Sequence, residues 1–96
     1  MRIMATVRVP VDKGNAVVAD GTMGQVVQEA LARIKPECAY FYLENGRRTM
    51  RAVFEMENQV EMVPAFEPLL IQLNAEVELT PVMTAAELED GFKALM

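Results

Sequence analysis

The sequence predicts one α+β domain, in which a four-stranded antiparallel sheet carries two long helices on one face. Three observations predict it: short β-type runs, helical runs with an apolar stripe between them, and an Asn-Gly pair joining two of the β-type runs. The order is strand, helix, strand, strand, helix, strand, helix. One core is expected over residues 1–96, because a chain of this length buries enough surface for a single domain.

The first strand is predicted over residues 2–9, which are rich in valine, isoleucine and threonine and end at Pro10. A turn is predicted at Gly14-Asn15, and the stretch that follows is compatible with a short helix. A long helix is predicted from Thr22, which stands at capping-box spacing before a glutamine and ahead of apolar residues at helical period. Pro36 ends this helix, because the residue before a proline avoids the helical conformation.

A β-hairpin is predicted from residues 38–44 and 47–56, because Asn45-Gly46 suits the two positive φ angles of a type I′ turn. A two-residue turn fixes the register and places Tyr40 opposite Arg51. Alternation then separates two faces. One face carries Ala39, Phe41, Leu43, Met50, Ala52 and Phe54, and the other carries Tyr40, Tyr42, Thr49, Arg51 and Val53.

A second long helix is predicted before Asn74, which is a suitable terminator, and Pro68 is expected to kink it. The apolar stripe of this helix consists of Val63, Phe66, Leu70 and Leu73. Residues 76–80 alternate strictly and predict the fourth strand. Thr84 and Glu87 form a capping box for a terminal helix, which we expect to cover the sheet, to dock on an opposite subunit or to lie on an outer edge.

Right-handed crossovers place both long helices on one face of a sheet with strand order 4-1-3-2, the ferredoxin-like βαββαβ arrangement. We call the other face the open face. Its predicted residues are Met4, Thr6, Arg8, Tyr40, Tyr42, Thr49, Arg51, Val53, Glu76, Glu78 and Thr80. These residues are too apolar for a face fully exposed to water, and they include too many charges for a dry core unless the charges form ion pairs. The set therefore predicts a partly covered cavity or a polar interface.

The composition excludes several kinds of chemistry. The chain has no histidine, serine or tryptophan and one cysteine, so it cannot assemble a serine or cysteine triad, a zinc site or a disulfide framework. It also lacks phosphate-loop and dinucleotide motifs, and we expect neither a metal nor a cofactor. A net charge of −5 disfavours nucleic acid. The sequence has no signal peptide or membrane span, which makes the cytoplasm the expected location.

Two runs of the chain resemble an uncharacterised family of small bacterial proteins, and the resemblance extends over most of the chain. The runs are Ala39-Tyr40-Phe41 through Gly46-Arg47-Arg48-Thr49, and Leu73-Asn74-Ala75-Glu76-Val77-Glu78-Leu79-Thr80-Pro81-Val82-Met83. The resemblance implies kinship in fold with the dimeric α/β-barrel proteins, whose paired sheets in several members enclose a small-molecule pocket. They include cofactor-free monooxygenases, lactone isomerases and haem-binding enzymes. No family motif assigns a role here, and the missing histidine departs from several of these enzymes.

The leading hypothesis is a small homodimeric domain joined through the open face, which binds an anionic or carbonyl-bearing molecule there. The predicted ligand-binding residues are Arg8, Tyr40, Tyr42 and Arg51. The alternative is a cofactor-free isomerase or monooxygenase, in which Glu76 or Glu78 removes a proton next to a carbonyl and the arginines and Tyr40 steady the anion. A third hypothesis is a regulatory module that recruits a protein by strand addition.

The same residues also have purely structural interpretations. Tyr40 and Arg51 can pack as a pair in a dimer seam, and Arg8 can form an ion pair with Glu76 or Glu78. Arg47 and Arg48 are expected to be solvated edge charges, and Cys38 a small packing residue.

Overall fold

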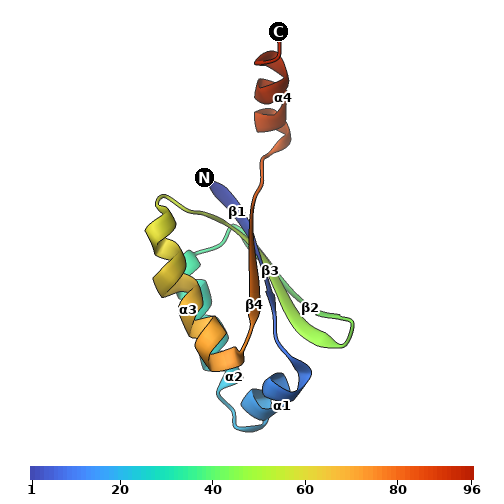
Figure 1. Ribbon diagram of the computed structural model, residues 1–96, viewed down its shortest axis with the longest axis vertical. Helices are drawn as coiled ribbons and strands as arrows, with labels where there is room; N and C mark the ends of the chain where they lie inside the picture. Colours follow the sequence, from blue (N-terminus) through green and yellow to red (C-terminus); the bar gives the residue numbers. More distant parts are fainter.

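A computed structural model describes residues 1–96 as four strands, four α-helices and one short 3₁₀ helix (Figure 1). The strands are β1 (Arg2–Arg8), β2 (Cys38–Glu44), β3 (Arg47–Glu55) and β4 (Glu76–Pro81). The helices are α1 (Val11–Ala19), α2 (Met23–Ile34), α3 (Met62–Leu73) and α4 (Ala85–Lys93), with η1 (Gln59–Glu61) leading into α3.

The four strands form one antiparallel sheet in the order β2-β3-β1-β4, which reads 4-1-3-2 from the opposite edge. The predicted α+β class and the four-stranded antiparallel sheet are therefore confirmed. Asn45 and Gly46 have φ angles of 52° and 79°, as the type I′ turn requires. The hairpin has the predicted register, including Tyr40 opposite Arg51.

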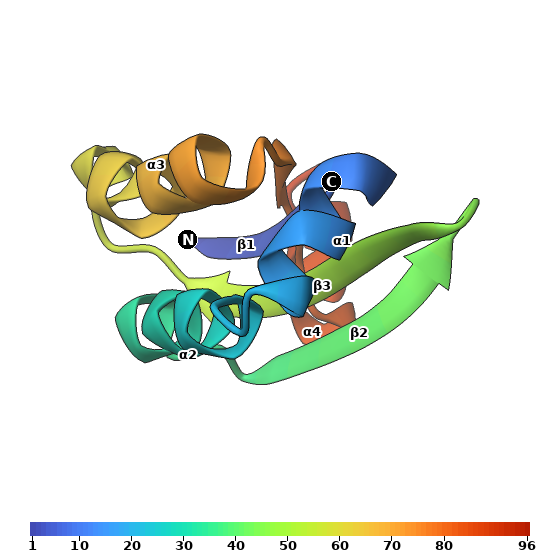
Figure 2. The ribbon, with the colours of Figure 1, turned by 90° about the horizontal axis from the view of Figure 1, so that it is seen from below.

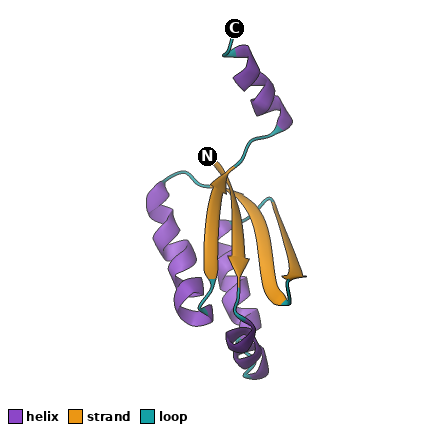
Figure 3. Cartoon of the chain, turned by 45° about the vertical axis from the view of Figure 1, so that its right-hand side comes forward, coloured by secondary structure: helices purple, strands orange, loops and turns teal.

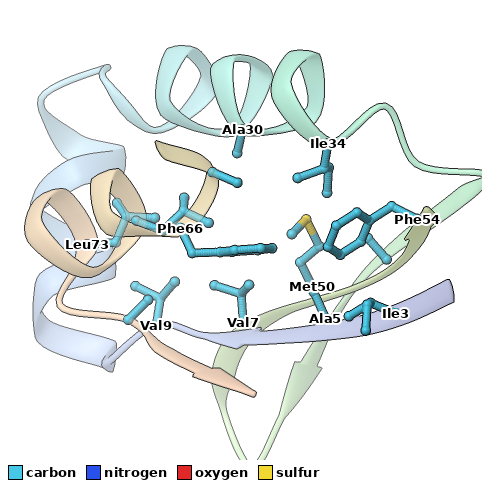
Figure 4. Close-up of a cluster of buried hydrophobic side chains, with 14 of the residues drawn as sticks. Ile3, Ala5, Val7, Val9, Ala30, Ile34, Met50, Phe54, Phe66 and Leu73 are labelled. Carbon is cyan, nitrogen blue, oxygen red and sulfur yellow. The ribbon is translucent and has the colours of Figure 1, made fainter. Parts of the chain in front are cut away.

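The core lies between one face of the sheet and helices α2 and α3 (Figures 3 and 4). Side chains of β1 such as Ile3 and Val7 point toward Ala30 and Ile34 of α2 in Figure 4. The rings of Phe54 and Phe66 have centroids 5.8 Å apart and are tilted by 51°. The six buried apolar residues of β1 and β3 lie on this face, as alternation predicts; they are Ile3, Ala5, Val7, Met50, Ala52 and Phe54.

Helix α1 departs from the expected arrangement, and α4 excludes one of the three placements expected for it, that of covering the sheet. The predicted turn at Gly14-Asn15 is wrong, because α1 runs through both residues. At Gly14 an added Cβ would lie 2.7 Å from Nη1 of Arg48, so the glycine allows the hairpin arginine to approach α1. At the other end of the molecule, α4 stands beyond the sheet and covers neither of its faces (Figures 1 and 3).

The helix ends show which capping predictions hold. Thr22 does not cap α2 with its side chain; its N–H and hydroxyl instead donate to Asp20 Oδ1 at 3.0 and 2.6 Å. These hydrogen bonds lower the pKa of Asp20, and the bond from the hydroxyl has the larger effect. Asn74 ends α3 in the left-handed conformation as predicted, and α3 continues through Pro68. The capping box of Thr84 and Glu87 is present.

Candidate functional site

The strand pairings place the open-face residues in rows that cross the sheet. In one row Tyr40, Arg51, Thr6 and Glu78 are successive partners on β2, β3, β1 and β4. The neighbouring row contains Tyr42, Thr49, Arg8 and Glu76. Thr6 and Thr49 are buried at the centre, whereas Tyr40 at the β2 edge is 69% exposed. The open face therefore has a tight central part and an aromatic edge that nothing in the chain covers.

Arg8 is the most enclosed charge on this face, with a side chain that is 12% exposed. Its Nη1 donates to Glu78 Oε1 at 2.5 Å, and its Nε donates to Glu44 Oε1 at 3.2 Å. The hydrogen bond to Glu78 does most to raise the pKa of Arg8, against partial desolvation, which lowers it. The predicted pairing with a β4 glutamate is confirmed for Glu78. Glu44 was missed, although alternation already places it on the same face as Tyr42.

Arg51 contacts a different tyrosine from the one expected. It is the partner of Tyr40 in the register, but its guanidinium carbon lies 5.8 Å from the ring centroid of Tyr42, diagonally across the hairpin. A cation–π contact at this distance is within range. The diagonal geometry leaves the ring of Tyr40 uncovered, and Tyr40 and Arg51 still share one side of the sheet.

The two candidate catalytic carboxylates are both exposed and both pair with arginines. Glu78 binds Arg8, and Glu76 Oε2 lies 3.6 Å from Nη1 of Arg47. Arg47 thus reaches toward the β4 edge, so the expectation that it is only a solvated edge charge is wrong. The surroundings of Glu76 and Glu78 are those of ion-pair partners, which neutralise the cations of the open face.

A second feature lies on the helix-bearing side, where an apolar cleft of about 350 Å³ opens between α2 and the hairpin. Its apolar wall includes Val7, Val9, Met23, Val27, Phe41 and Leu43. Phe41 and Leu43 were expected to face the core, yet they are 55% and 71% exposed. The reason is that β2 runs away from α2 toward the hairpin turn, so the helix does not cover that end of the strand (Figure 2).

Arg48 lines the same cleft and does not behave as a free edge charge. Its Nη1 donates to Asn15 Oδ1 at 3.1 Å, which ties the hairpin to α1 and corrects the prediction of a solvated side chain. The cleft therefore has an apolar interior with one cationic side chain, Arg48, at its side. Sequence periodicity assigned Phe41 and Leu43 to the correct face but gave no information on how far α2 extends over them.

Cys38 lies at the start of β2, opposite Val53, and is exposed. The prediction that it is a packing residue is therefore wrong. Strand β2 is at the edge of the sheet, and alternation places Cys38 on the same uncovered open face as Tyr40.

Comparison of the chain with protein-family models, with curated proteins and with solved structures found no match. None of the helices has both the length and the apolar character that crossing a bilayer requires. The open face and the apolar cleft are the two candidate sites of the molecule.

Proposed function

We propose that the protein is a small homodimeric domain of the ferredoxin-like, dimeric α/β-barrel type, in which two copies pack open face to open face. The observation that carries the proposal is the uncovered edge of Tyr40 and Arg51 beside the buried Thr6 and Thr49. A two-fold interface must be complementary to itself. The open face has exposed aromatic groups together with charges of both signs, which suits such self-association.

Closing the two faces on each other creates the enclosed layer in which a small molecule can bind. Arg51 has its guanidinium beside Tyr42, and Tyr40 adds a hydroxyl on the same side of the sheet. A guanidinium and a hydroxyl on one side of the sheet are donor groups that suit a carboxylate or a carbonyl oxygen. Arg8 is held in place by Glu78 and Glu44, which neutralise its charge, so the negative charge of the ligand would be met by Arg51.

The enzyme alternative receives less support from the geometry. A base that removes a proton next to a carbonyl needs access to substrate in a site closed to water. Glu78 is bound to Arg8 and Glu76 lies beside Arg47, and both carboxylates are exposed in the single chain. A binding domain can use these same residues, because binding does not require either carboxylate to act as a base.

Sedimentation equilibrium tests the dimer. The wild-type chain should be dimeric at micromolar concentration, and Tyr40→Glu should weaken dimerisation at least tenfold, because it places an unpaired charge in the interface. Ile71→Glu is the matched control, since Ile71 on α3 is 72% exposed and lies away from the open face. A monomeric wild type, or equal dimerisation of both variants and wild type, overturns the proposal.

Native mass spectrometry of freshly purified protein tests the ligand. The expected spectrum shows dimers that retain an additional small mass, and Arg51→Met should lose that mass while staying dimeric. A dimer that retains no mass, or a mass that Arg51→Met keeps, rejects the assignment of ligand binding to the open face.

A further inference from the structure

Helix α4 has an apolar stripe that nothing in its own chain covers. The stripe consists of Leu88 and Phe92 in the helix and Leu95 in the turn that follows it, and all three are exposed, Phe92 by 58%. The helix nevertheless has a well-defined beginning, because Thr84 and Glu87 cap each other and Arg2 Nη1 donates to Glu87 Oε1 at 2.6 Å. An anchored helix that presents three large apolar side chains to water indicates a missing partner.

The apolar cleft is the second uncovered surface, and it lies at the opposite end of the molecule. Its lining includes Val9 and Leu43, which are at the hairpin end of the sheet, whereas α4 leaves from the end where β1 begins (Figures 1 and 2). The cleft lies between helix α2 and strand β2. An amphipathic helix is a natural occupant of such a groove, because its stripe inserts side chains along one line.

The chain cannot place its own α4 in its own cleft. The N–H of Val82 donates to the carbonyl of Arg2 at 3.1 Å, so β4 stays paired to β1 beyond Pro81 and only Met83 and Thr84 link it to α4. Two residues span at most about 7 Å. The six residues of β4 extend about 20 Å, and three strand spacings of about 14 Å separate β4 from β2. Folding α4 back would therefore lay it along the β4 edge.

We propose that α4 of one chain lies in the apolar cleft of a second copy, and that the second copy returns the same contact. The cleft lies on the helix-bearing side of the sheet, so this contact is a second interface between copies, which goes beyond the open-face contact of the proposed function. A two-fold axis across the long dimension brings the α4 end of each copy to the hairpin end of the other. The single chain measures 56 Å along that dimension and 28 Å across, which reflects how far α4 extends from its own body.

Charge and area both favour this occupant. The stripe of α4 is flanked by Glu87, Glu89 and Asp90, and the cleft has Arg48 at its side. Leu88, Phe92 and Leu95 with Phe41 and Leu43 can each lose on the order of 100 Å² of exposed surface. Five such side chains in two equivalent contacts give about 1,000 Å², which is the area that a specific interface needs.

Disulfide trapping between two differently labelled chains tests the contact. In a Cys38→Ala background, one chain carries Leu43→Cys and the other carries Phe92→Cys, and the two are mixed and mildly oxidised. We expect a crosslinked heterodimer to form at least tenfold faster than with Val60→Cys in place of Leu43→Cys. Val60 in η1 is similarly exposed but lies at the other end of the molecule (Figure 1). Equal rates for the two pairs overturn the proposal.

A second variant separates this contact from the open-face dimer. Two separate measurements are compared: dimerisation of Tyr40→Glu, and crosslinking of the Leu43→Cys and Phe92→Cys chains. If Tyr40→Glu abolishes dimerisation and the cysteine pair does not crosslink, the open-face dimer stands and the placement of α4 is wrong. If the pair crosslinks while Tyr40→Glu remains fully dimeric, the α4 contact stands and the open face is not the interface. A small molecule retained in native mass spectra, lost in Leu43→Asp and accompanied by no crosslink assigns the cleft to that molecule and rejects α4 as its occupant.

Discussion

Arg8 of β1 and Glu78 of β4 are joined by a hydrogen-bonded ion pair with Nη1 and Oε1 2.5 Å apart. The same guanidinium donates to Glu44 at 3.2 Å, so one side chain connects the β4 edge with the end of β2 across the open face. This arrangement explains how two glutamates and an arginine share a surface whose central threonines are buried. Of these three side chains Arg8 is the least exposed, so water is least able to replace the interactions that it makes.

We expect Arg8→Met to destabilise the fold more than Glu78→Gln. Removing the arginine leaves two carboxylates without their shared cation, whereas Glu78→Gln retains an amide oxygen that can accept from Arg8. Urea unfolding of both variants and of the double variant measures the difference and the coupling between the residues. Equal midpoints for the two single variants would contradict the expected ranking, and additive effects in the double variant would show that the two residues are not coupled.

The core between α3 and the sheet gives a prediction with a larger magnitude. Phe66 is buried against Phe54, and Phe66→Ala should lower the free energy of unfolding by about 3–5 kcal/mol, because the deletion removes apolar contact and leaves a cavity. Ile71→Ala on the exposed side of the same helix should change it by no more than about 0.5 kcal/mol. Thermal or urea unfolding compares them, and a loss below about 1 kcal/mol for Phe66→Ala would contradict the described core.

Lys35 ends α2 with a φ angle of 47°, a left-handed conformation that is costly for a residue with a Cβ atom. Lys35→Gly should therefore raise the free energy of unfolding by about 1 kcal/mol. Lys13→Gly is the control, since Lys13 lies inside α1 and glycine there should cost about 1 kcal/mol. Urea titrations of the two variants should shift in opposite directions, and a destabilised Lys35→Gly would refute the assignment of strain to this position.

Local rules predicted the parts of this fold that depend on near neighbours in the chain. Asn45-Gly46 set the turn, the turn set the register, and the register placed Tyr40 beside Arg51. The capping box of Thr84 and Glu87 could also be predicted from the sequence, because all of its hydrogen bonds form within four residues. The same rules failed at Gly14-Asn15, where packing of Arg48 on α1 overrides the turn preference of the pair.

The candidate site was only partly predictable for a physical reason. Alternation determines the face on which a side chain lies, but it does not determine where the end of a long side chain goes. Arg51 therefore lies over Tyr42 and not over its partner Tyr40. The exposed positions of Phe41 and Leu43 depend on the length and tilt of α2 relative to the hairpin, which no local pattern contains.

The beginning of α4 should be sensitive to acid. Hydrogen bonding from the backbone N–H of Thr84 is the largest cause that lowers the pKa of Glu87 below its ordinary value of 4.5, and Arg2 adds to the effect. Because the folded pKa is depressed, the stabilisation by the carboxylate is present above pH 4.5 and is lost as the pH falls through the folded pKa. The helical chemical shifts of α4 should therefore move toward coil values below pH 4.5, before the core unfolds.

Two variants separate the capping box from general acid unfolding. Thr84→Ala should weaken α4 by about 1 kcal/mol at neutral pH, because the hydroxyl no longer accepts from the N–H of Glu87. Glu87→Gln should keep a cap that does not titrate, since its amide oxygen still accepts from Thr84. NMR titration of the wild type and of Glu87→Gln, with the core resonances as an internal reference, measures the difference. If α4 responds to acid identically in both, the capping carboxylate does not control the helix that we place in the partner's cleft.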